Sequence, residues 1–444
     1  MSFRPQIFTT KLLLLGSAVL ALSAAAQAQD FYMNTASARS NALGGTYVAT
    51  SSDAVDALAA NPAGLSFLRG RNLNLDVDAI FARGSFSNSV NSNSPMRTDA
   101  GVIPYGAFGM PIGHSRFSFA VGVMPDLLSD SDWRYVDAPG TAGASYGLQE
   151  QKSSIIAIRS AAGVGFAFSK KFSVGATVGA DYNQNQLKAP YIFQSQPQVA
   201  SLKTLLDLHT EGVGWNYSFG FMAKPSDRWQ FGGAWKSRTV IDSTGDATGD
   251  ANAQFAALGI NAPSTFAYGA RVRNVLPQSV LDNAAFQANR RWLFAFQGNW
   301  INWHDSFVNL PVSLTGGTNL TINSVVGSAA LNDGVPLNWK DQYAFHGGVE
   351  RTLTENTVLR FGFAHANSPV PDSTLTPMTA AIMTNQITGG FGYNHGRSRW
   401  ELAYSFHPTA SQSVGQSGLL AGEYNNSTVH VGTQSAMLSY SFKF

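Results

Sequence analysis

Histidine, cysteine and acidic side chains are the groups from which proteins build most catalytic and metal-binding sites. The sequence has no cysteine, and its eight histidines lie at positions 114, 209, 304, 346, 365, 395, 407 and 430. No two of these histidines have the spacing of a paired metal-ligand motif. We therefore expect a protein with no metal site, no cofactor and no catalytic residue, and hence not an enzyme.

The composition limits the environment in which the chain can fold. A net charge of +2 argues against a nucleic-acid partner. Charged residues make up 13% of the chain, against roughly 25% in soluble globular proteins, while aromatic residues reach 12% and glycine numbers 43. Few charges with many aromatic residues and glycines favour a surface that partly faces lipid.

The first residues have the pattern of an export signal. Arg4 and Lys11 precede the apolar run LLLLGSAVLALSAAA, and Ala26-Gln27-Ala28 has the small-x-small form of a cleavage site. We therefore predict a signal peptide at 1–28. No later stretch of about 18 apolar residues occurs, so we do not expect membrane-spanning helices.

Alternation with a period of two dominates the remaining chain. In RWLFAFQGNW, Trp292, Phe294 and Phe296 fall on one strand face, and Ala295 and Gln297 fall on the other. WNYSFGF, RWQFGGAW and SRWELAYSF repeat this pattern. Bulky apolar residues outside and small or polar residues inside are typical of a transmembrane β-barrel. The small inner face predicts a wet or ligand-lined lumen.

The connections between the alternating segments differ in length. Short polar turns are expected at 113–115, 169–171, 225–227, 288–290, 353–356 and 395–397. Long segments rich in Ser, Asn, Gly and Pro are expected at 84–101, 126–152, 188–210, 239–276, 304–337, 368–386 and 408–429. Six turns and seven loops join fourteen strands. Short turns inside and long loops outside are the outer-membrane pattern, so we predict an all-β, antiparallel transmembrane barrel.

The strand boundaries follow from these connections. We expect strands at 72–83, 102–112, 116–125, 153–168, 172–187, 211–224, 228–238, 277–287, 291–303, 338–351, 357–367, 387–395, 398–407 and 430–444. Leu438, Tyr440, Phe442 and Phe444 share one face of the last strand. This aromatic end resembles the signal read by the barrel assembly machinery, which we expect as a partner.

A segment before the first strand interrupts the pattern. In DALAANPAGLSFL, Asn61-Pro62 ends a helix-like run, because proline lacks an N–H and forces the preceding residue into extended geometry. From the residues alone, Asn61, Pro62 and Ala63 are read as an ordinary turn that leads into the barrel.

Three blocks of the sequence together resemble the FadL-type family of outer-membrane long-chain fatty acid transporters. They are SARSNALGGTYVATSSDAVDALAANPAGLSFL, LPQSVLDNAAFQANRRWLFAFQGNWINW and NWKDQYAFHGGVERTLTENTVLRFGFAHANSPVPD. The resemblance implies a hatch at 29–70 that plugs a fourteen-stranded barrel at 71–444. Asn61, Pro62 and Ala63 would then be a hatch-anchoring turn.

The resemblance also implies a function and a location. We expect a monomer in the outer membrane of a Gram-negative-type bacterium, in contact with lipopolysaccharide and other outer-membrane lipid. It would passively take up long-chain fatty acids or similar hydrophobic molecules. Capture in a groove among outer loops would precede transfer to a lumenal pocket, hatch rearrangement and release. Two alternatives stay open: a PorV-like secretion or assembly partner that transports nothing, and a transporter of aromatic hydrocarbons.

Candidate ligand-contact residues lie on a loop and in the lumen. Leu202, Leu205 and Leu206 have helical spacing, and would either pack a loop helix on the barrel rim or line an acyl-chain groove. The alternation of inward and outward residues along the predicted strands places a set of charged residues in the lumen. They are Asp76, Asp78, Arg159, Asp181, Lys236, Arg238, Glu350, Arg360 and Glu401.

Most of these lumenal charges should form mutual ion pairs that brace the interior. Arg159, Lys236 and Arg360 are our candidates for holding a carboxylate head group. Gly122 and Pro125 lie at the end of the third predicted strand. They mark either simple strand termination, which is the slightly favoured reading, or a kink that opens the barrel wall.

Overall fold

The computed structural model of the 444-residue chain describes residues 37–51, 53–97 and 100–444. The predicted signal peptide at 1–28 and the first part of the predicted hatch, 29–36, lie outside the described residues.

The strands are β1 Asn72–Ser87, β2 Ser94–Pro95, β3 Ala100–Pro111, β4 Phe117–Val136, β5 Leu148–Ala167, β6 Phe172–Ile192, β7 Lys203–Ala223, β8 Trp229–Lys236, β9 Thr239–Asp250, β10 Thr265–Leu276, β11 Ser279–Asn289, β12 Trp292–Ile301, β13 Asn309–Thr315, β14 Leu331–Pro336, β15 Gln342–Thr352, β16 Thr357–Ala366, β17 Asn385–His395, β18 Ser398–Val414 and β19 Ser427–Lys443. The α-helices are α2 Ala38–Ala42, α3 Ala54–Ala59, α4 Asn252–Ala257 and α5 Leu320–Val326, and the 3₁₀ helices are η1 Pro62–Phe67, η2 Thr141–Gly143, η3 Asp372–Thr374, η4 Pro377–Thr379 and η5 Leu420–Gly422.

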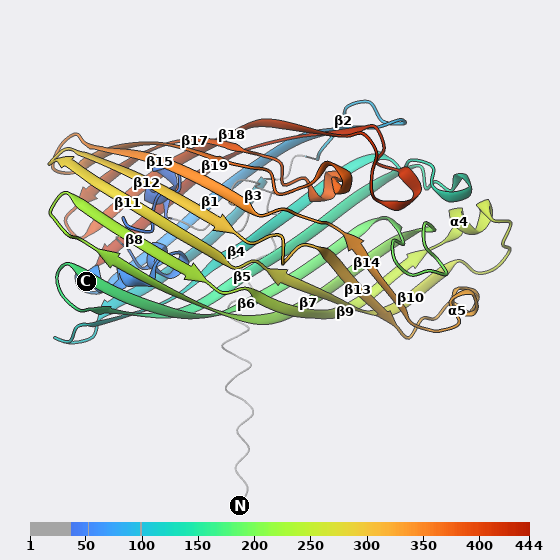
Figure 1. Ribbon diagram of the computed structural model, residues 1–444, viewed down its shortest axis with the longest axis horizontal. Helices are drawn as coiled ribbons and strands as arrows, with labels where there is room; N and C mark the ends of the chain where they lie inside the picture. Colours follow the sequence, from blue (N-terminus) through green and yellow to red (C-terminus); the bar gives the residue numbers. More distant parts are fainter. Residues whose placement is uncertain (1–36, 52, 98–99) are drawn as a thin grey trace, which may run out of the picture.

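The strands form one closed antiparallel barrel (Figure 1). β1 pairs with β3 on one side and with the last strand, β19, on the other, so the sheet has no free edge there. Four wall strands are each interrupted once and carry two labels: β8 with β9, β10 with β11, β12 with β13, and β14 with β15. With β1, β3–β7 and β16–β19, these make fourteen wall strands. The predicted fourteen-stranded barrel is confirmed. No helix in the described part of the chain is long and apolar enough to cross a membrane.

The outer face of β7 shows where lipid meets the barrel. Val213, Trp215, Tyr217, Phe219 and Phe221 alternate along this face, and all are exposed. Five alternating residues cover nine positions of the strand, which is the number that a tilted strand needs to cross a bilayer. The exposed residues that precede them on the same face are Asp207, His209 and Glu211. The strand therefore leaves the lipid at this point and continues into water.

Many strands are longer than the sequence predicted, and the error lies at their outer ends. The predicted loops at 126–152, 188–210, 239–276, 304–337 and 408–429 all contain strand residues. β6 and β7, for example, stay paired from Phe172↔Ala223 to Ile192↔Lys203. Beyond the membrane the outer face has no reason to be apolar. The alternation that predicts membrane strands therefore disappears there, although backbone pairing continues.

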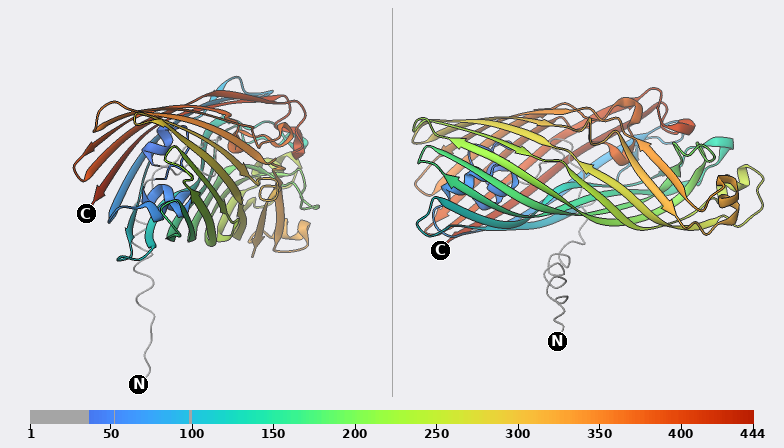
Figure 2. Two further views of the ribbon diagram at one scale, coloured as in Figure 1. Left: turned by 60° about the vertical axis from the view of Figure 1, so that its left-hand side comes forward. Right: turned by 60° about the horizontal axis from the view of Figure 1, so that its bottom comes forward.

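Residues 37–51 and 53–68 lie inside the barrel, at the end where the chain terminates (Figures 1 and 2). We call this segment, with its helices α2, α3 and η1, the plug. Its contacts explain the small residues on the inner wall. A Cβ atom on Gly175 would lie 2.3 Å from the Pro62 carbonyl carbon, and one on Gly362 would lie 2.0 Å from the Gly44 nitrogen. At these positions the small inner face is packed against the plug backbone, so the predicted wet lumen is wrong there.

The strand that was expected to end at Pro125 continues to Val136, so simple termination is wrong. β4 stays paired with β5 throughout, with one register shift between Pro125 and Leu127 that marks a bulge. On its other side, β4 pairs with β3 only from Pro111↔Ser118 to Gly106↔Val123. Pro125 lacks an N–H and lies where the pairing with β3 has just ended, so it breaks no bond of that ladder. Above this point the described residues of β3 and β4 are not paired with each other.

Candidate ligand cavity and plug

An apolar cavity lies in the barrel above the plug, on the side of the outer loops. Strands β4, β5 and β6 form one wall, and β13 and β14 form another. The segment around η4 and the loop that contains η5 cover it. Its volume is about 160 Å³. An apolar cavity of about 150 Å³ is large enough to bind benzene in another protein.

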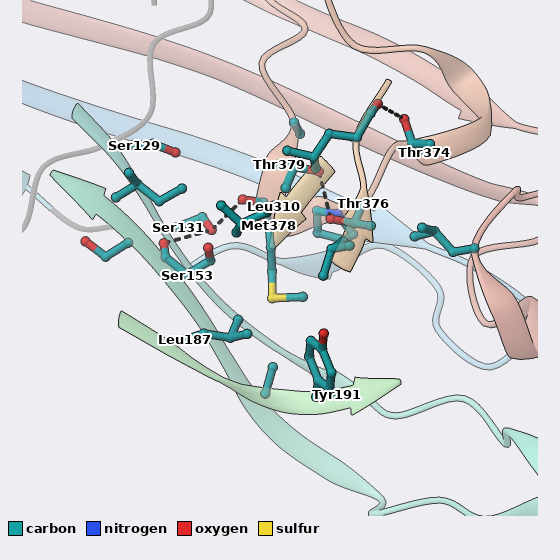
Figure 3. A pocket seen from close by; sticks show the side chains of 18 of the residues that line it. Ser129, Ser131, Ser153, Leu187, Tyr191, Leu310, Thr374, Thr376, Met378 and Thr379 are labelled. Carbon is teal, nitrogen blue, oxygen red and sulfur yellow. Dashed lines mark hydrogen bonds between the residues drawn. The ribbon is translucent and has the colours of Figure 1, made fainter. Parts of the chain in front are cut away.

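The cavity has an apolar body and a small set of hydroxyl groups (Figure 3). Leu187, Tyr191, Leu310 and Met378 belong to the apolar part. Hydroxyl groups come from β4, β5 and the segment that contains η3 and η4. They include those of Ser129, Ser131, Ser153, Thr374, Thr376 and Thr379. Several of these hydroxyls already have protein partners: Thr376 bonds Thr379 at 2.9 Å between their Oγ1 atoms. Apolar walls with a few oriented polar groups are typical of a site for a small hydrophobic ligand.

Glu423 is the one charged residue among the described residues that line the cavity. It belongs to a buried ionic cluster with Lys203 and Asp137. The Lys203 Nζ lies 2.7 Å from Asp137 Oδ1 and 3.4 Å from Glu423 Oε2, and it also donates to the Ala138 carbonyl at 2.6 Å. Burial raises the pKa of Glu423 to about 8, although the nearby ammonium acts in the opposite direction. The cluster joins the β4–β5 loop, the start of β7 and the β18–β19 loop above the cavity.

A second apolar site opens among the outer loops, and we call it the outer groove. It has a volume of about 120 Å³ and lies between α4, α5 and the tip of the β6–β7 hairpin. Phe193, Val199, Leu202, Phe255, Leu258, Ile260, Phe266, Tyr268, Ile322, Val325 and Leu331 provide its apolar lining. Lys203 also lines it, so the ionic cluster reaches the outer groove through Lys203 and the cavity through Glu423.

The predicted loop leucines occupy two different sites. Leu202 lines the outer groove, Leu206 lines the cavity, and Leu205 is half-buried beside Asp250 of β9. The predicted helix is wrong, because Leu205 and Leu206 belong to β7, where backbone pairing with β6 fixes extended geometry. The buried pair Leu206 and Leu208 reveals the period of two that the helical spacing concealed.

Asn61 forms hydrogen bonds with another part of the plug and with the barrel wall. Its side-chain amide donates to the Val48 carbonyl in the plug and to the Phe221 carbonyl of β7, both at 2.9 Å. Its Oδ1 accepts from the Ala63 N–H at 3.1 Å, which caps η1, and Pro62 occupies the first position of that helix. The Ala63 carbonyl accepts from the Ser173 hydroxyl of β6 at 3.1 Å.

The three basic residues considered for a carboxylate head group all have protein partners. Arg159 donates to the Leu58 carbonyl of the plug, to Asn216 and to Thr177 at 2.8–2.9 Å. Lys236 forms an ion pair with Asp126, the extra residue of the β4 bulge. Arg360 pairs with Glu350 at 2.7 Å and also with Glu401. Arg159, Lys236 and Arg360 do not line the cavity.

Two further charged residues lie where strand alternation did not place them. Arg39 of the plug pairs with Glu350 of the wall at 3.2 Å, which joins α2 to the pairs made by Arg360. Arg238, in contrast, is exposed, so its predicted lumenal position is wrong. It lies in the interruption between β8 and β9, where the alternation of inner and outer residues is reset.

One motif in the sequence has the form of a nucleophile turn. Gly143, Ser145 and Gly147 match G-x-S-x-G, but they lie in the loop between β4 and β5 rather than between a strand and a helix. The Ser145 hydroxyl donates to the Asp137 carbonyl at 2.6 Å and accepts from the Gly147 N–H at 3.2 Å. These bonds give Ser145 a role in shaping the loop.

No pattern in the sequence predicts that Glu423 and the hydroxyls around η4 line the cavity. Both lie in long outer loops, where no period predicts which residues face inward. Only the sharp contrast of a lone acidic residue within GLLAGEYNN could have drawn attention to Glu423. Among the described residues, no group of three or more His, Asp or Glu side chains is arranged to hold a metal ion.

A closed barrel with a lipid-facing band, an internal plug and an apolar cavity defines an outer-membrane barrel of the transport type. The chain belongs to the outer membrane protein transport protein family (OMPP1/FadL/TodX), whose family model matches residues 18–444. It is an outer-membrane transporter of hydrophobic compounds. No curated protein matches the sequence.

Solved structures of similar fold include two toluene transporters and a FadL homologue. TodX from Pseudomonas putida has 21% identity and a TM-score of 0.74, over 94% of this chain and 100% of that chain. TbuX from Ralstonia pickettii has 18% identity and a TM-score of 0.70, over 93% and 100%. A FadL homologue from Pseudomonas aeruginosa has 16% identity and a TM-score of 0.70, over 95% and 99%. At these identities the likeness concerns the fold.

Proposed function

We propose that the cargo of this transporter is an uncharged hydrophobic molecule about the size of one aromatic ring. The observation that carries the proposal is the lining of the cavity: among the described residues it contains one carboxyl group, Glu423, and no Lys, Arg or His. A carboxylate head group would need a cation or several free hydrogen-bond donors to leave water. The hydroxyls of Ser131, Thr374, Thr376 and Thr379 already bond protein atoms. The apolar walls and the volume of about 160 Å³ suit a ring of benzene size.

A long-chain fatty acid is the competing cargo. Its carboxylate would find the nearest cation at Lys203, whose ammonium is already held by Asp137 and the Ala138 carbonyl. Its chain has more than twice as many carbons as benzene and would have to extend out of the cavity. The TodX and TbuX structures are described as toluene transporters, which supports the aromatic reading for a chain of the same fold.

The route follows from the order of the two apolar sites. The outer groove captures cargo from water, and burial of each CH₂ group or its aromatic equivalent contributes roughly 0.8 kcal/mol. Cargo then enters the cavity beneath the ionic cluster. Movement of the plug at residues 37–68, anchored by Asn61, Pro62 and Ala63, opens the way out, and separation of β3 and β4 above Gly122 and Pro125 offers a lateral exit. Ligand must bind the rearranged state more tightly for this motion to be driven.

Other features of the proposal concern partners. We propose a monomer that is embedded in outer-membrane lipid and lipopolysaccharide, and whose terminal Phe444 is read by the assembly machinery. No chemistry is carried out on the cargo. Arg159, Lys236 and Arg360 brace the lumen and the plug and would reach a head group only after rearrangement.

The test compares uptake of labelled toluene and labelled oleate into vesicles that contain the purified protein. We expect toluene uptake above that of empty vesicles, and no comparable gain for oleate. Ser153→Phe, which places a ring in the cavity, should abolish the gain. Ser169→Phe, in an exposed periplasmic turn, is the matched control and should leave it intact. Uptake of oleate but not toluene would contradict the proposed cargo.

A further inference from the structure

The position of Glu423 makes it unusual among the residues of the cavity. Its side chain is 1% exposed, and one of its oxygens, Oε2, lies 3.4 Å from the Lys203 ammonium. The other oxygen, Oε1, is buried and accepts no hydrogen bond within the described part of the chain. A buried polar atom without a partner destabilises the structure that contains it. A ligand that supplies the missing hydrogen bond would remove this penalty.

The surrounding charges restrict which ligand group can do so. A ligand ammonium at Glu423 would lie close to Lys203, which already provides a cation on that side. A ligand carboxylate would face the Asp137 carboxylate, whose Oδ1 lies 2.7 Å from the same ammonium and already balances its charge. Like charges in a dry site repel strongly. A plain hydrocarbon fits the apolar walls but leaves Oε1 without a partner.

We propose that Glu423 determines the specificity of the cavity, and that the preferred cargo is an uncharged aromatic molecule with one hydroxyl group, a phenol. The ring lies against the apolar walls and the hydroxyl bonds Glu423. This inference rests on the proposed function, because it names the chemical class within the aromatic cargo. A site built to bond a hydroxyl discriminates against the analogue that lacks it.

The protonation state of Glu423 is compatible with this assignment. Burial raises the pKa of its carboxyl group to about 8, and Lys203, Asp137, Tyr135 and Tyr424 are the ionisable groups that face it. Near neutral pH the carboxyl group is mostly protonated. A phenol hydroxyl both donates and accepts, so it can bond the acid as well as the carboxylate.

Glu423 can be replaced without leaving the Lys203 ammonium unpaired. Lys203 keeps Asp137 at 2.7 Å and the Ala138 carbonyl at 2.6 Å when the glutamate is removed. Glu423→Met should therefore fold, with a lining that is apolar throughout. Glu423→Gln keeps both the shape and a hydrogen-bonding end. Glu355→Met, in an exposed turn at the opposite end of the barrel, is the matched control.

The test measures binding of four ring compounds to the detergent-purified full-length protein, by the fluorescence of Trp133 and Trp339 in the cavity wall. The probes are 4-cresol, toluene, 4-methylbenzoate and benzylamine. We expect 4-cresol to bind about tenfold more tightly than toluene, the effect of one added hydrogen bond, with the two ions weaker than both. Glu423→Gln and Glu355→Met should keep this preference, and Glu423→Met should lose it while still binding toluene.

The outcomes separate this inference from the proposed function. Equal binding of 4-cresol and toluene by the unmodified protein, or a cresol preference that survives in Glu423→Met, would overturn the role of Glu423 alone. Tightest binding of benzylamine would overturn the assignment of an uncharged cargo. Binding of none of the four compounds would overturn the proposed function and this inference with it. Heat-modified mobility on gels shows that each variant has formed its barrel.

Discussion

Asn61 shows how one side chain fixes a plug within a barrel. It is fully buried, and its amide bonds a carbonyl of the plug and a carbonyl of the wall at once. We predict that Asn61→Ala destabilises this attachment by about 1–3 kcal/mol, because both carbonyls lose a buried donor. Hydrogen exchange followed by mass spectrometry should show faster exchange in residues 37–68 and unchanged exchange in the wall strands.

The control for this prediction is Asn356→Ala, in an exposed turn between β15 and β16. It should leave the exchange of the plug unchanged. If Asn61→Ala also left it unchanged, the plug would be held by its other bonds, such as the donation from Arg159 to the Leu58 carbonyl at 2.9 Å.

At the same scale, Glu423 predicts a pH dependence of stability. Burial raises the pKa of this carboxyl group to about 8, above its ordinary value of 4.5. Between these values the folded state binds more protons than the unfolded state, so stability falls as pH rises from about 4.5 to about 8. Thermal unfolding at pH 5, 7 and 9 should show this decrease, and Glu423→Gln should reduce it. An identical pH profile in Glu423→Gln would contradict the assignment.

At the scale of elements, the inner face of β6 is shaped by η1 of the plug. A Cβ atom at Gly175 would lie 2.3 Å from the Pro62 carbonyl carbon, which is too close for either backbone to tolerate. We predict that Gly175→Ala displaces η1 and increases ion conductance across planar bilayers, while the barrel still forms.

Gly298→Ala provides the matched control, because a Cβ atom there meets nothing within 4 Å. It makes the same chemical change in another wall strand, β12, and should leave the conductance at the level of the unmodified protein. Equal conductance of both variants would mean that the plug accommodates the added methyl group.

The elements that the sequence could predict are those in contact with lipid. Phe219 and Phe221 on β7 alternate with small inner residues, and this contrast identified the strand and its parity. Leu205 and Leu206 lie on the same strand above the membrane, where the outer face is polar and the contrast is lost. Loop residues such as Glu423 carry no periodic signal, since their direction depends on packing among distant segments.

At the scale of the whole molecule, the plug and the two apolar sites lie at different levels along the barrel axis. The plug lies at the end with short turns (Figures 1 and 2). The residues that line the cavity and the outer groove lie toward the end with long loops. The ionic cluster of Lys203, Asp137 and Glu423 lies between the two apolar sites. On the proposed route, cargo that enters from the loops meets Glu423 before it reaches the plug.

The most direct test of the account is a crystal structure of the full-length protein soaked with bromobenzene, with the bromine located by its anomalous scattering. The account predicts a bromine peak inside the cavity, among Leu187, Tyr191 and Leu310. A peak in the outer groove alone, or no peak within the barrel at concentrations that saturate uptake, would contradict it.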